Sequence, residues 1–409
     1  AEEISTMPAS GAGAPVFVED KSSLDVQWVN GLFPEKEVVD VRTVSVKDVG
    51  GFMGDMSRLE VVFKSGESKN YIFKQLLDDK LATSRQIGCA REAFFYNSEL
   101  SKEVGGLIPE IVYAYGDTET GEKYLFMEDL GHGLQAGLLF GPTNPNNWAK
   151  QQAGELATIE AEYLSESVTL EDVTTAICAG SARVHAAYWA KQDLLELPWL
   201  RGTNWWQKSN PDAFTQAMGG AIDNWKKAQE TVAANPDVWD PELVALVNAS
   251  FEKATEENYL EFTRNTAWSL VHGDFHPANV MWMGKKAAKP TIEDVKLVDW
   301  EMVGVGNGAQ EVGQFMISHT EPAKRKDMEV RVMRAYYAEL TAHGVSPDVY
   351  PWERCWADYL EGGLGRWLWF IGWMAASMPV MLNKFFTSQV LAFARDHGFT
   401  PANAPIPRI

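Results

Sequence analysis

The spacing of apolar residues changes near residue 130. Up to that point, short runs rich in β-branched residues alternate with turns, and the ranges 38–46, 59–63 and 70–75 are predicted to be strands. Beyond it, apolar residues recur mostly at helical spacing, with a few short strands near residue 275. These two patterns predict an α+β protein with a small N-terminal lobe built on an antiparallel sheet and a larger, mainly helical C-terminal lobe.

Glycines and prolines mark the boundary between the two lobes. They are concentrated between Gly131 and Pro145, directly after an apolar run that ends near Leu130. We therefore place the N-terminal lobe at residues 16–130 and the C-terminal lobe at residues 131–409. Residues 1–15 are small and polar, with no apolar stretch of the kind found in a signal peptide, and they are predicted to form a disordered tail.

Capping residues and apolar spacing predict the helices. Two helices are predicted over 83–104 and 148–164, and a third runs from Thr169 to 189. A fourth begins at Asn210-Pro211, and a fifth begins at Asp240-Pro241 and reaches about Arg264. The uncharged run 367–382 is shorter than the roughly 20 residues that a spanning helix needs, and it contains Pro379. We expect this run to be a buried core helix, with no insertion into a membrane.

A polar loop at residues 272–279 interrupts the apolar pattern of the C-terminal lobe. Apolar residues lead into it and Val280-Met281-Trp282 leaves it, so two short strands are predicted to flank it. Asp274 and Asn279 lie in this loop, and a further carboxylate, Asp299, follows the next apolar run. Carboxylate and amide oxygens are groups that hold Mg²⁺ and orient a hydroxyl for phosphoryl transfer.

The N-terminal lobe contains residues suited to binding phosphates. A glycine-rich turn at 48–57, with Gly50, Gly51 and Gly54, can direct backbone N–H groups at phosphate oxygens, although such turns are common for conformational reasons alone. Lys74 lies in the middle of an apolar strand and Glu92 follows in the next predicted helix. A solvent-facing lysine is the simpler explanation, and Arg91 and Glu99 are alternative charged residues, but a strand lysine paired with a helix glutamate is the arrangement that kinases use.

Composition excludes some classes of partner. The chain has 409 residues, with 36 Lys and Arg against 56 Asp and Glu, so its formal net charge is −20. This balance argues against nucleic acid, which requires a basic surface. The 3 cysteines are widely separated and odd in number, which favours a reducing, cytoplasmic setting over a disulfide framework. The sequence does not predict an oligomeric state.

The motif His272-Gly273-Asp274 with Asn279, followed by Asp299-Trp300, resembles the aminoglycoside phosphotransferase and choline kinase-like superfamily. Residues 182–189 also resemble a helix of that group, and the aromatic, helical C-terminal third is similar in layout to the ecdysteroid kinase-like branch. The resemblance implies a bilobal protein-kinase-like fold, ATP and Mg²⁺ as cofactors, and transfer of the γ-phosphate to a small-molecule alcohol.

The roles expected under this resemblance fall on particular residues. Asp274 orients and deprotonates the attacking hydroxyl, whereas Asn279 and Asp299 hold Mg²⁺. Lys74, Glu92 and the glycine-rich turn serve the nucleotide phosphates. The adenine ring is expected along the backbone of Met127, Glu128 and Leu130.

The sequence departs from the protein-kinase pattern in ways that favour a small-molecule acceptor. His276 replaces a lysine that is frequent in serine/threonine kinases, and Trp300-Glu301 follows Asp299 where protein kinases have Phe-Gly. Glu311 lies where many relatives have an aspartate, and whether it replaces that residue is open. Candidate substrate residues are the aromatic and acidic side chains Trp300, Glu301, Trp352, Trp356, Asp358 and Glu361, which would suit an amine through cation–π contacts.

Several alternatives remain open on the sequence. The residues at positions 352, 356 and 359 have helical spacing that is also typical of core packing. A metal-dependent hydrolase would instead use His272, Asp274, His276 and Asp299 as ligands, although Asn279 and Lys74 then have no role. A non-catalytic nucleotide-binding relative is the third hypothesis. Amino alcohols, aminoglycoside-like sugars and steroid-like alcohols are all compatible acceptors.

Overall fold

The computed structural model describes residues 14–18, 23–44, 54–203, 213–286 and 288–409. The chain forms two compact units: Ala1–Gly133 with Lys296–Val303, and Leu134–Val295 with Gly304–Ile409. The sequence-based division after residue 130 assigned 296–303 to the C-terminal lobe, whereas the structure assigns this segment to the first unit. Most of the predicted N-terminal tail lies outside the described residues.

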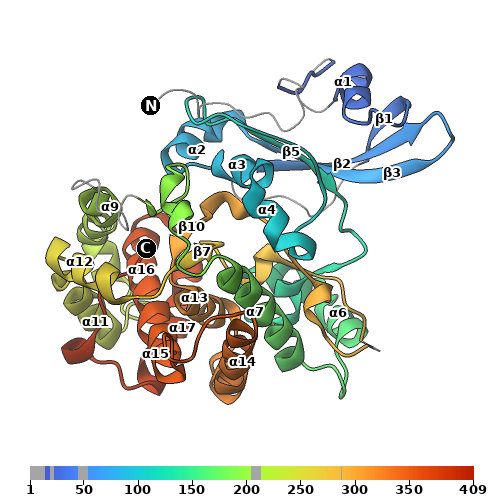
Figure 1. The fold of residues 1–409 in the computed structure, drawn as a ribbon. Helices are drawn as coiled ribbons and strands as arrows, with labels where there is room; N and C mark the ends of the chain where they lie inside the picture. Colours follow the sequence, from blue (N-terminus) through green and yellow to red (C-terminus); the bar gives the residue numbers. More distant parts are fainter. Residues whose placement is uncertain (1–13, 19–22, 45–53, 204–212, 287) are drawn as a thin grey trace. The chain divides into compact units, whose positions relative to one another are not determined.

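The first unit is built on a five-stranded antiparallel sheet with the order β1-β2-β3-β5-β4. Its strands are β1 Val38–Val44, β2 Gly54–Phe63, β3 Ser68–Leu76, β4 Ile111–Gly116 and β5 Lys123–Glu128 (Figure 1). The strands predicted at 59–63 and 70–75 are confirmed, and the strand predicted at 38–46 is confirmed as far as Val44, after which the chain lies outside the described residues. The predicted glycine-rich turn is partly different, because Gly54–Ser57 already belongs to β2 and residues 45–53, with Gly50 and Gly51, lie outside the described part of the chain.

Short helices accompany this sheet. They are α1 Val26–Gly31, α2 Leu81–Ile87, α3 Arg91–Asn97 and α4 Glu99–Val104, with 3₁₀ turns η1 Asp78–Lys80, η2 Gly105–Leu107 and η8 Trp300–Met302. The single helix predicted over 83–104 is wrong. Gly88 ends α2 in the left-handed conformation, with φ +81°, and Ser98 is extended between α3 and α4.

The second unit is mainly helical. Its α-helices are α5 Trp148–Gln152, α6 Leu156–Tyr163, α7 Leu170–Ala187, α9 Ala213–Lys227, α10 Gln229–Ala234, α11 Pro241–Glu252, α12 Glu256–Asn265, α13 Gly308–His319, α14 Pro322–Ala342, α15 Trp352–Ala357, α16 Gly363–Ser377 and α17 Val380–Asp396. A π-helical turn, η9 Asp358–Gly362, joins α15 to α16. The 3₁₀ turns are η3 Ala136–Leu139, η4 Pro145–Asn147, η5 Gln192–Glu196, η6 Pro277–Asn279, η7 Ile292–Asp294 and η10 Pro401–Asn403.

The predicted helix starts were more accurate than the predicted ends. Thr169 caps α7 in a reciprocal box with Asp172, and Asp240 caps α11. The helix predicted from Asp240-Pro241 to Arg264 is two helices, because Thr255 caps a new one, and the helix predicted over 148–164 is also divided in two. The predicted start at Asn210-Pro211 lies outside the described residues.

The run 367–382 belongs to two helices, α16 and α17, which are separated at Pro379, the N-cap residue of α17. Much of α16 is buried, as predicted, but Trp373 and Met381 are exposed. Among the described residues, none of the helices is both long enough and apolar enough to span a membrane.

Two pairs of short strands hold the polar loop of the second unit. Strand β7 Ser269–Val271 pairs antiparallel with β10 Gly304–Gly306, and β8 Val280–Trp282 pairs with β6 Leu134–Gln135. The loop at 272–279 therefore has a fixed strand at each end. Helix α13, every residue of which is buried, packs against β7 and supplies the side chains beneath the loop. The last strand, β9 Val295–Leu297, leads out of this unit to Asp299.

Candidate active site

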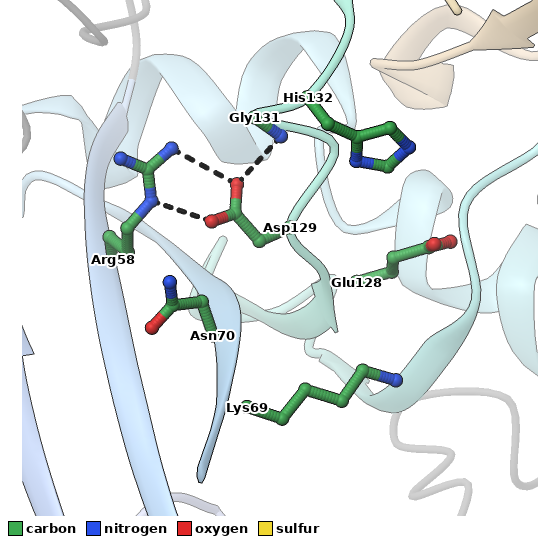
Figure 2. Close-up of a pocket in the computed structure, with 7 residues that line it drawn as sticks. All are labelled: Arg58, Lys69, Asn70, Glu128, Asp129, Gly131 and His132. Carbon is green, nitrogen blue, oxygen red and sulfur yellow. Dashed lines mark hydrogen bonds and ion pairs between the residues drawn. The ribbon is translucent and has the colours of Figure 1, made fainter.

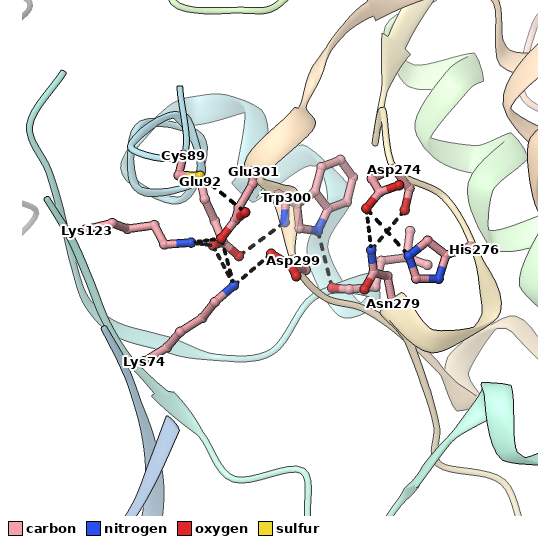
Figure 3. A network of polar contacts seen from close by, with 11 residues as sticks. Lys74, Cys89, Glu92, Lys123, Asp274, His276, Asn279, Asp299, Trp300 and Glu301 are labelled. Carbon is pink, nitrogen blue, oxygen red and sulfur yellow. Dashed lines mark hydrogen bonds and ion pairs between the residues drawn. The ribbon is translucent and has the colours of Figure 1, made fainter. Parts of the chain in front are cut away.

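Five charged residues of the first unit form one cluster, which we call the lysine–carboxylate cluster: Lys74, Lys123, Glu92, Asp299 and Glu301. The ammonium of Lys74 lies 3.0 Å from Glu92 Oε2, 2.7 Å from Asp299 Oδ1 and 3.3 Å from Glu301 Oε1 (Figure 3). Lys123 lies 2.5 Å from the same Glu92 oxygen and also contacts Glu301. The predicted pairing of Lys74 with Glu92 is therefore present.

The sheet register places both lysines on one face. Lys74 lies opposite Leu125 in the antiparallel pairing of β3 with β5. Opposed residues project to the same face, and so do residues two apart along a strand. Lys123, two residues before Leu125, therefore shares the face of Lys74. Sequence reasoning missed Lys123 because it directly follows the turn at Gly121, where a solvated lysine is common. The available signal was its position two residues before Leu125, which places both side chains on the same face of the strand.

Electrostatics keeps the buried members of the cluster charged. Burial alone would lower the pKa of Lys74, but Asp299, Glu92 and Glu301 outweigh it and raise that pKa well above its usual value. The pKa of Lys123 is raised in the same way by Glu301 and Glu92. Burial opposes ionisation of Glu92 as well, yet Lys123 and Lys74 hold its pKa below the ordinary value. Both ammonium groups and Glu92 are thus ionised at neutral pH.

The segment after β9 carries Asp299 and contacts α3. Asp299 adopts a left-handed backbone conformation, with φ +69°, which is uncommon for a residue other than glycine and is frequent at functional positions. The next backbone N–H, that of Trp300, donates to Glu92 Oε1 at 3.1 Å. The Trp300 indole stacks on Phe95 with ring centroids 4.3 Å apart and is 0% exposed. The predicted substrate role of Trp300 is wrong, because this side chain has no surface left to offer.

An open pocket of about 500 Å³ borders the segment after β5. In Figure 2, Arg58 of β2 faces Asp129, and the two form a bidentate ion pair with nitrogen–oxygen distances of 2.6 and 3.1 Å. Asp129 also accepts from the backbone N–H of Gly131 at 2.9 Å. This pair fixes β2 to the segment that follows β5, where the adenine ring was predicted. Met127 and Leu130 are buried there, and their contact with adenine, like that of Glu128, stays a prediction.

In the second unit, the loop at 272–279 presents Asp274 with its side chain 37% exposed. Asn279 Nδ2 donates to the Asp274 backbone carbonyl at 3.0 Å and to its carboxylate at 3.3 Å (Figure 3). His276 accepts from Ala278 N at Nδ1, which leaves Nε2 as the protonated nitrogen facing Asp274 at 3.5 Å. Burial opposes ionisation of Asp274, but His276, His272 and Arg366 hold its pKa well below the usual value. The carboxylate is therefore ionised and oriented.

Glu311 fastens this loop from beneath. Its Oε1 accepts from the backbone N–H of Gly273 at 2.6 Å, and its Oε2 lies 2.9 Å from His185 Nε2. Gly273 has φ +84°, a conformation that favours glycine. His185 is buried and also bonds the Tyr336 hydroxyl, so it has a structural role beneath the loop. His272 Nδ1 accepts from the backbone N–H of Asp274 at 3.3 Å, which stabilises the loop itself.

A buried arginine and an amide approach the same loop from α16 and α13. Arg366 donates to the Gly273 carbonyl at 3.0 Å and to Gln314 Oε1 at 3.2 Å. This contact turns the Gln314 amide so that its nitrogen faces Asp274 Oδ1, 3.4 Å away. Burial lowers the pKa of Arg366 to about 9. Neither residue belonged to the sequence-based site, because each is distant in sequence from residues 272–279.

The remaining predicted substrate residues have structural partners. Asp358 is 2% exposed and accepts from Asn307, Tyr350 and Arg354 at 2.8–3.0 Å. Trp352 and Trp356 stack on each other, and Trp356 stacks on Tyr359, which matches the core-packing alternative. Glu361 is exposed and pairs with Arg408. Glu301 belongs to the lysine–carboxylate cluster. We therefore do not retain this set as a substrate site.

Oxygen donors suited to Mg²⁺ are present in both units. The carboxylates of Glu92, Asp299 and Glu301 each have an oxygen within 4.8 Å of the others, and Asp299, at 39% side-chain exposure, is the most accessible of the three. In the second unit, Asn279 uses its amide nitrogen on Asp274, so its oxygen is available as a ligand. Mg²⁺ prefers oxygen ligands of this kind.

Part of the chain is similar to a known protein family. Residues 191–345, which contain Asp274, Asn279 and Asp299, match the ecdysteroid kinase-like family. No curated protein matches the chain by sequence. Among solved structures, choline kinase from Cryptosporidium parvum is 10% identical, with a TM-score of 0.50 over 89% of this chain and 92% of the other.

Two further solved structures are more distant in shape. An ethanolamine kinase from Plasmodium vivax is 10% identical, with a TM-score of 0.42 over 88% of this chain and 84% of the other. Amicoumacin kinase in complex with AMP-PNP, Ca²⁺ and Ami is 9% identical, with a TM-score of 0.43 over 88% and 89%. The chain therefore has the bilobal α+β fold of choline kinase, and it is similar to the ecdysteroid kinase-like family across residues 191–345.

Proposed function

We propose that the protein is an ATP- and Mg²⁺-dependent kinase that transfers the γ-phosphate to a hydroxyl group of a small molecule. The observation that carries this proposal is the position of Lys74, whose ammonium is held by a helix glutamate, Glu92, and by Asp299. A strand lysine, a helix glutamate and an aspartate in this contact are the parts that kinases use to hold nucleotide phosphates and metal.

Each residue then has a defined task. Lys74 donates to the nucleotide phosphates, and Glu92 keeps its side chain extended toward them. Asp299 in the first unit and the oxygen of Asn279 in the second are the residues that would hold Mg²⁺, which would neutralise phosphate charge when bound. Asp274 accepts a hydrogen bond from the acceptor hydroxyl and takes its proton as that oxygen bonds to the γ-phosphorus. The bond from the γ-phosphorus to the bridging oxygen breaks in the same transfer, and ADP leaves. His276 and Gln314 keep the carboxylate of Asp274 ionised and aligned.

The surroundings of Asp274 include aromatic rings that suit an acceptor with an apolar body. Arg366 lies behind the loop, and its guanidinium is 4.3 Å from the ring centroid of Phe370 and 4.9 Å from that of Trp369, both of which are partly exposed. Partly exposed aromatic rings favour an apolar substrate body. An alcohol with an apolar skeleton is therefore our preferred acceptor class, ahead of an aminoglycoside.

The hydrolase alternative is not supported by the imidazoles. His272 and His276 each use Nδ1 to accept a backbone N–H, and among the described residues the group able to gather three ligand atoms around one ion is Glu92, Asp299 and Glu301, with no histidine. Zinc sites in hydrolases usually rely on histidine nitrogen. A non-catalytic nucleotide-binding relative is the remaining alternative, and measured turnover separates it from a kinase.

A panel of alcohols tests the proposal. The purified protein is incubated with ATP, Mg²⁺ and, in separate wells, sterol-like, terpenoid, sugar and amino alcohols, and ATP consumption above the no-acceptor rate is measured. We expect turnover with at least one apolar alcohol and its loss in Asp274→Ala. Binding of ATP without turnover across every class would support the non-catalytic relative instead, and tightly held zinc without any ATP binding would support the hydrolase.

A further inference from the structure

Lys123 and Glu301 form a second lysine–glutamate pair that shares Glu92 with the first. Lys123 has a side-chain exposure of 0% and contacts Glu92 Oε2 and Glu301 Oε1, the same two oxygens that Lys74 contacts. The other Glu301 oxygen accepts from the Cys89 thiol, with 3.4 Å between sulfur and oxygen. Glu301 is therefore fully engaged inside the first unit, between two ammonium groups and a thiol.

The charges of the cluster show what Lys123 contributes. Two ammonium groups face three carboxylates, so the cluster carries 2 − 3 = −1. With Lys123 in place, Glu92 and Glu301 each keep a buried cationic partner even when Lys74 turns to a different anion. Without Lys123, a single ammonium would have to serve three carboxylates, and leaving a buried carboxylate without its partner is costly.

We propose that Lys123 and Glu301 are positioning residues that free Lys74 and Asp299 for nucleotide and metal. Lys123 neutralises Glu92 and Glu301, so that Lys74 can exchange its contact with Asp299 for the phosphates of ATP without stranding either glutamate. Asp299, at 39% side-chain exposure, is then the carboxylate without a buried lysine and becomes available to a cation. This inference rests on the proposed function, because it assigns these residues to the same nucleotide site.

The backbone contacts of Glu301 support this assignment. Arg91, at the start of α3, donates to the Glu301 carbonyl at 3.0 Å, and the Trp300 N–H donates to Glu92 at 3.1 Å. Both bonds fasten residues 300–301 to α3, which carries Glu92. Lys123 therefore acts on a segment whose backbone is already fixed, and its effect on Lys74 is through charge and side-chain contacts.

The test measures binding of AMP-PNP with Mg²⁺ by isothermal titration calorimetry, with thermal unfolding of the ligand-free protein recorded in parallel. Lys123→Met should weaken binding by about tenfold to a hundredfold, because Lys74 then stays with the glutamates and one charge-assisted hydrogen bond to the nucleotide is lost. The double variant Lys123→Met/Glu301→Gln restores the net charge of the cluster to −1 and should recover most of that loss. Glu301→Gln alone should weaken binding by about tenfold or less, a smaller loss than in Lys123→Met, because Lys123 still neutralises Glu92.

A lysine in an exposed pair serves as the matched control. Lys64 lies 2.7 Å from Glu37, and both side chains are more than half exposed, so Lys64→Met should leave binding unchanged. A purely structural role for Lys123 predicts that the double variant is no better than Lys123→Met, and that result, or parental affinity in Lys123→Met, would overturn the inference.

The design also separates the inference from the proposal on which it rests. If Lys123→Met does not fold, the double variant decides: a folded double variant that binds supports the inference, and one that does not bind overturns it. If neither folds, Glu301→Gln decides: weakened binding supports the inference, and parental affinity overturns it. Absence of AMP-PNP binding by the parent protein would overturn the proposed function itself, and with it this inference.

Discussion

Substitution of Glu311 should destabilise the second unit far more than its hydrogen-bond distances alone would suggest. Glu311 is 5% exposed and makes contacts of 2.6 Å to Gly273 N and 2.9 Å to His185 Nε2. Glu311→Ala removes both contacts, which leaves the buried Gly273 N–H without this acceptor and His185 Nε2 with only the Ser181 hydroxyl, 3.4 Å away. Hydrogen bonds to a charged group contribute about 1.5–3 kcal/mol each, so losing these two, one of which Ser181 partly replaces, should cost about 3–5 kcal/mol.

The expected change in melting temperature follows from the size of the unit. For domains of this size class, 1 kcal/mol corresponds to a shift of roughly 2–4 °C, so Glu311→Ala should lower Tm by roughly 6–20 °C. Glu311→Gln keeps an acceptor for Gly273 and should lose about half as much or less. Calorimetry or circular dichroism on the two variants and the parent provides these values.

A surface glutamate with equally short contacts is the matched control. Glu171 accepts two hydrogen bonds from Arg331, at 2.6 and 2.7 Å, but the arginine side chain is 55% exposed. Exposed ion pairs contribute about 0–1 kcal/mol, so Glu171→Ala should shift Tm by only a few degrees. If Glu311→Ala and Glu171→Ala destabilised the protein equally, the burial argument and the anchoring role of Glu311 would both be refuted.

Three further predictions address capping, charge and catalysis. Thr169→Ala removes the capping box of α7, in which Asp172 N donates to Thr169 at 3.2 Å, and should cost about 1 kcal/mol in denaturant unfolding; no measurable loss would contradict the capping argument. Glu329 contacts Arg325 at 2.9 Å and Tyr359 at 2.8 Å. Burial opposes its ionisation, but His397 and Arg325 lower its pKa in the folded protein. Its contribution to the free energy of unfolding is therefore present above the unfolded pKa of about 4.3 and is lost as pH falls through the folded pKa. Glu329→Gln should therefore flatten the acid limb of stability against pH, and an unchanged limb would exclude Glu329 as its source. Gln314→Leu removes the amide between Arg366 and Asp274 and should lower kcat about tenfold at an unchanged KM for ATP; an unchanged kcat would count against a positioning role.

Much of this site was predictable because its residues lie in local sequence patterns. Lys74 in an apolar strand, Glu92 in the helical run that follows, and Asp274 and Asn279 five residues apart each carry a signal within one or two elements. The structure brings Lys74, Glu92 and Asp299 together, and it brings Asp274 and Asn279 together. The predicted strands succeeded for the same reason, since alternation is a property of neighbouring residues.

The features that sequence reasoning missed depend on contacts between distant segments. Trp300 looked like a substrate residue because it follows Asp299, but Phe95 covers it from the first unit's α3. Arg366 has no local pattern that separates a buried cation from a solvated one, and the even spacing of Lys123 from Leu125 indicates burial only once the pairing of β3 with β5 is known. Breaks at Gly88 and Ser98 interrupt a helical pattern whose apolar spacing continues, because one left-handed or extended residue ends the helix without changing that spacing.

Transfer of labelled phosphate tests the central claim most directly. The protein and its Asp274→Asn variant are incubated with γ-³²P-ATP, Mg²⁺ and an acceptor alcohol from the panel, and organic phosphate ester is separated from ATP and inorganic phosphate. The account predicts that the label enters an ester with the parent protein, while Asp274→Asn binds ATP within about threefold of the parent yet transfers roughly a thousandfold more slowly. Undiminished transfer by Asp274→Asn, or label that never reaches an alcohol of any class, would contradict it.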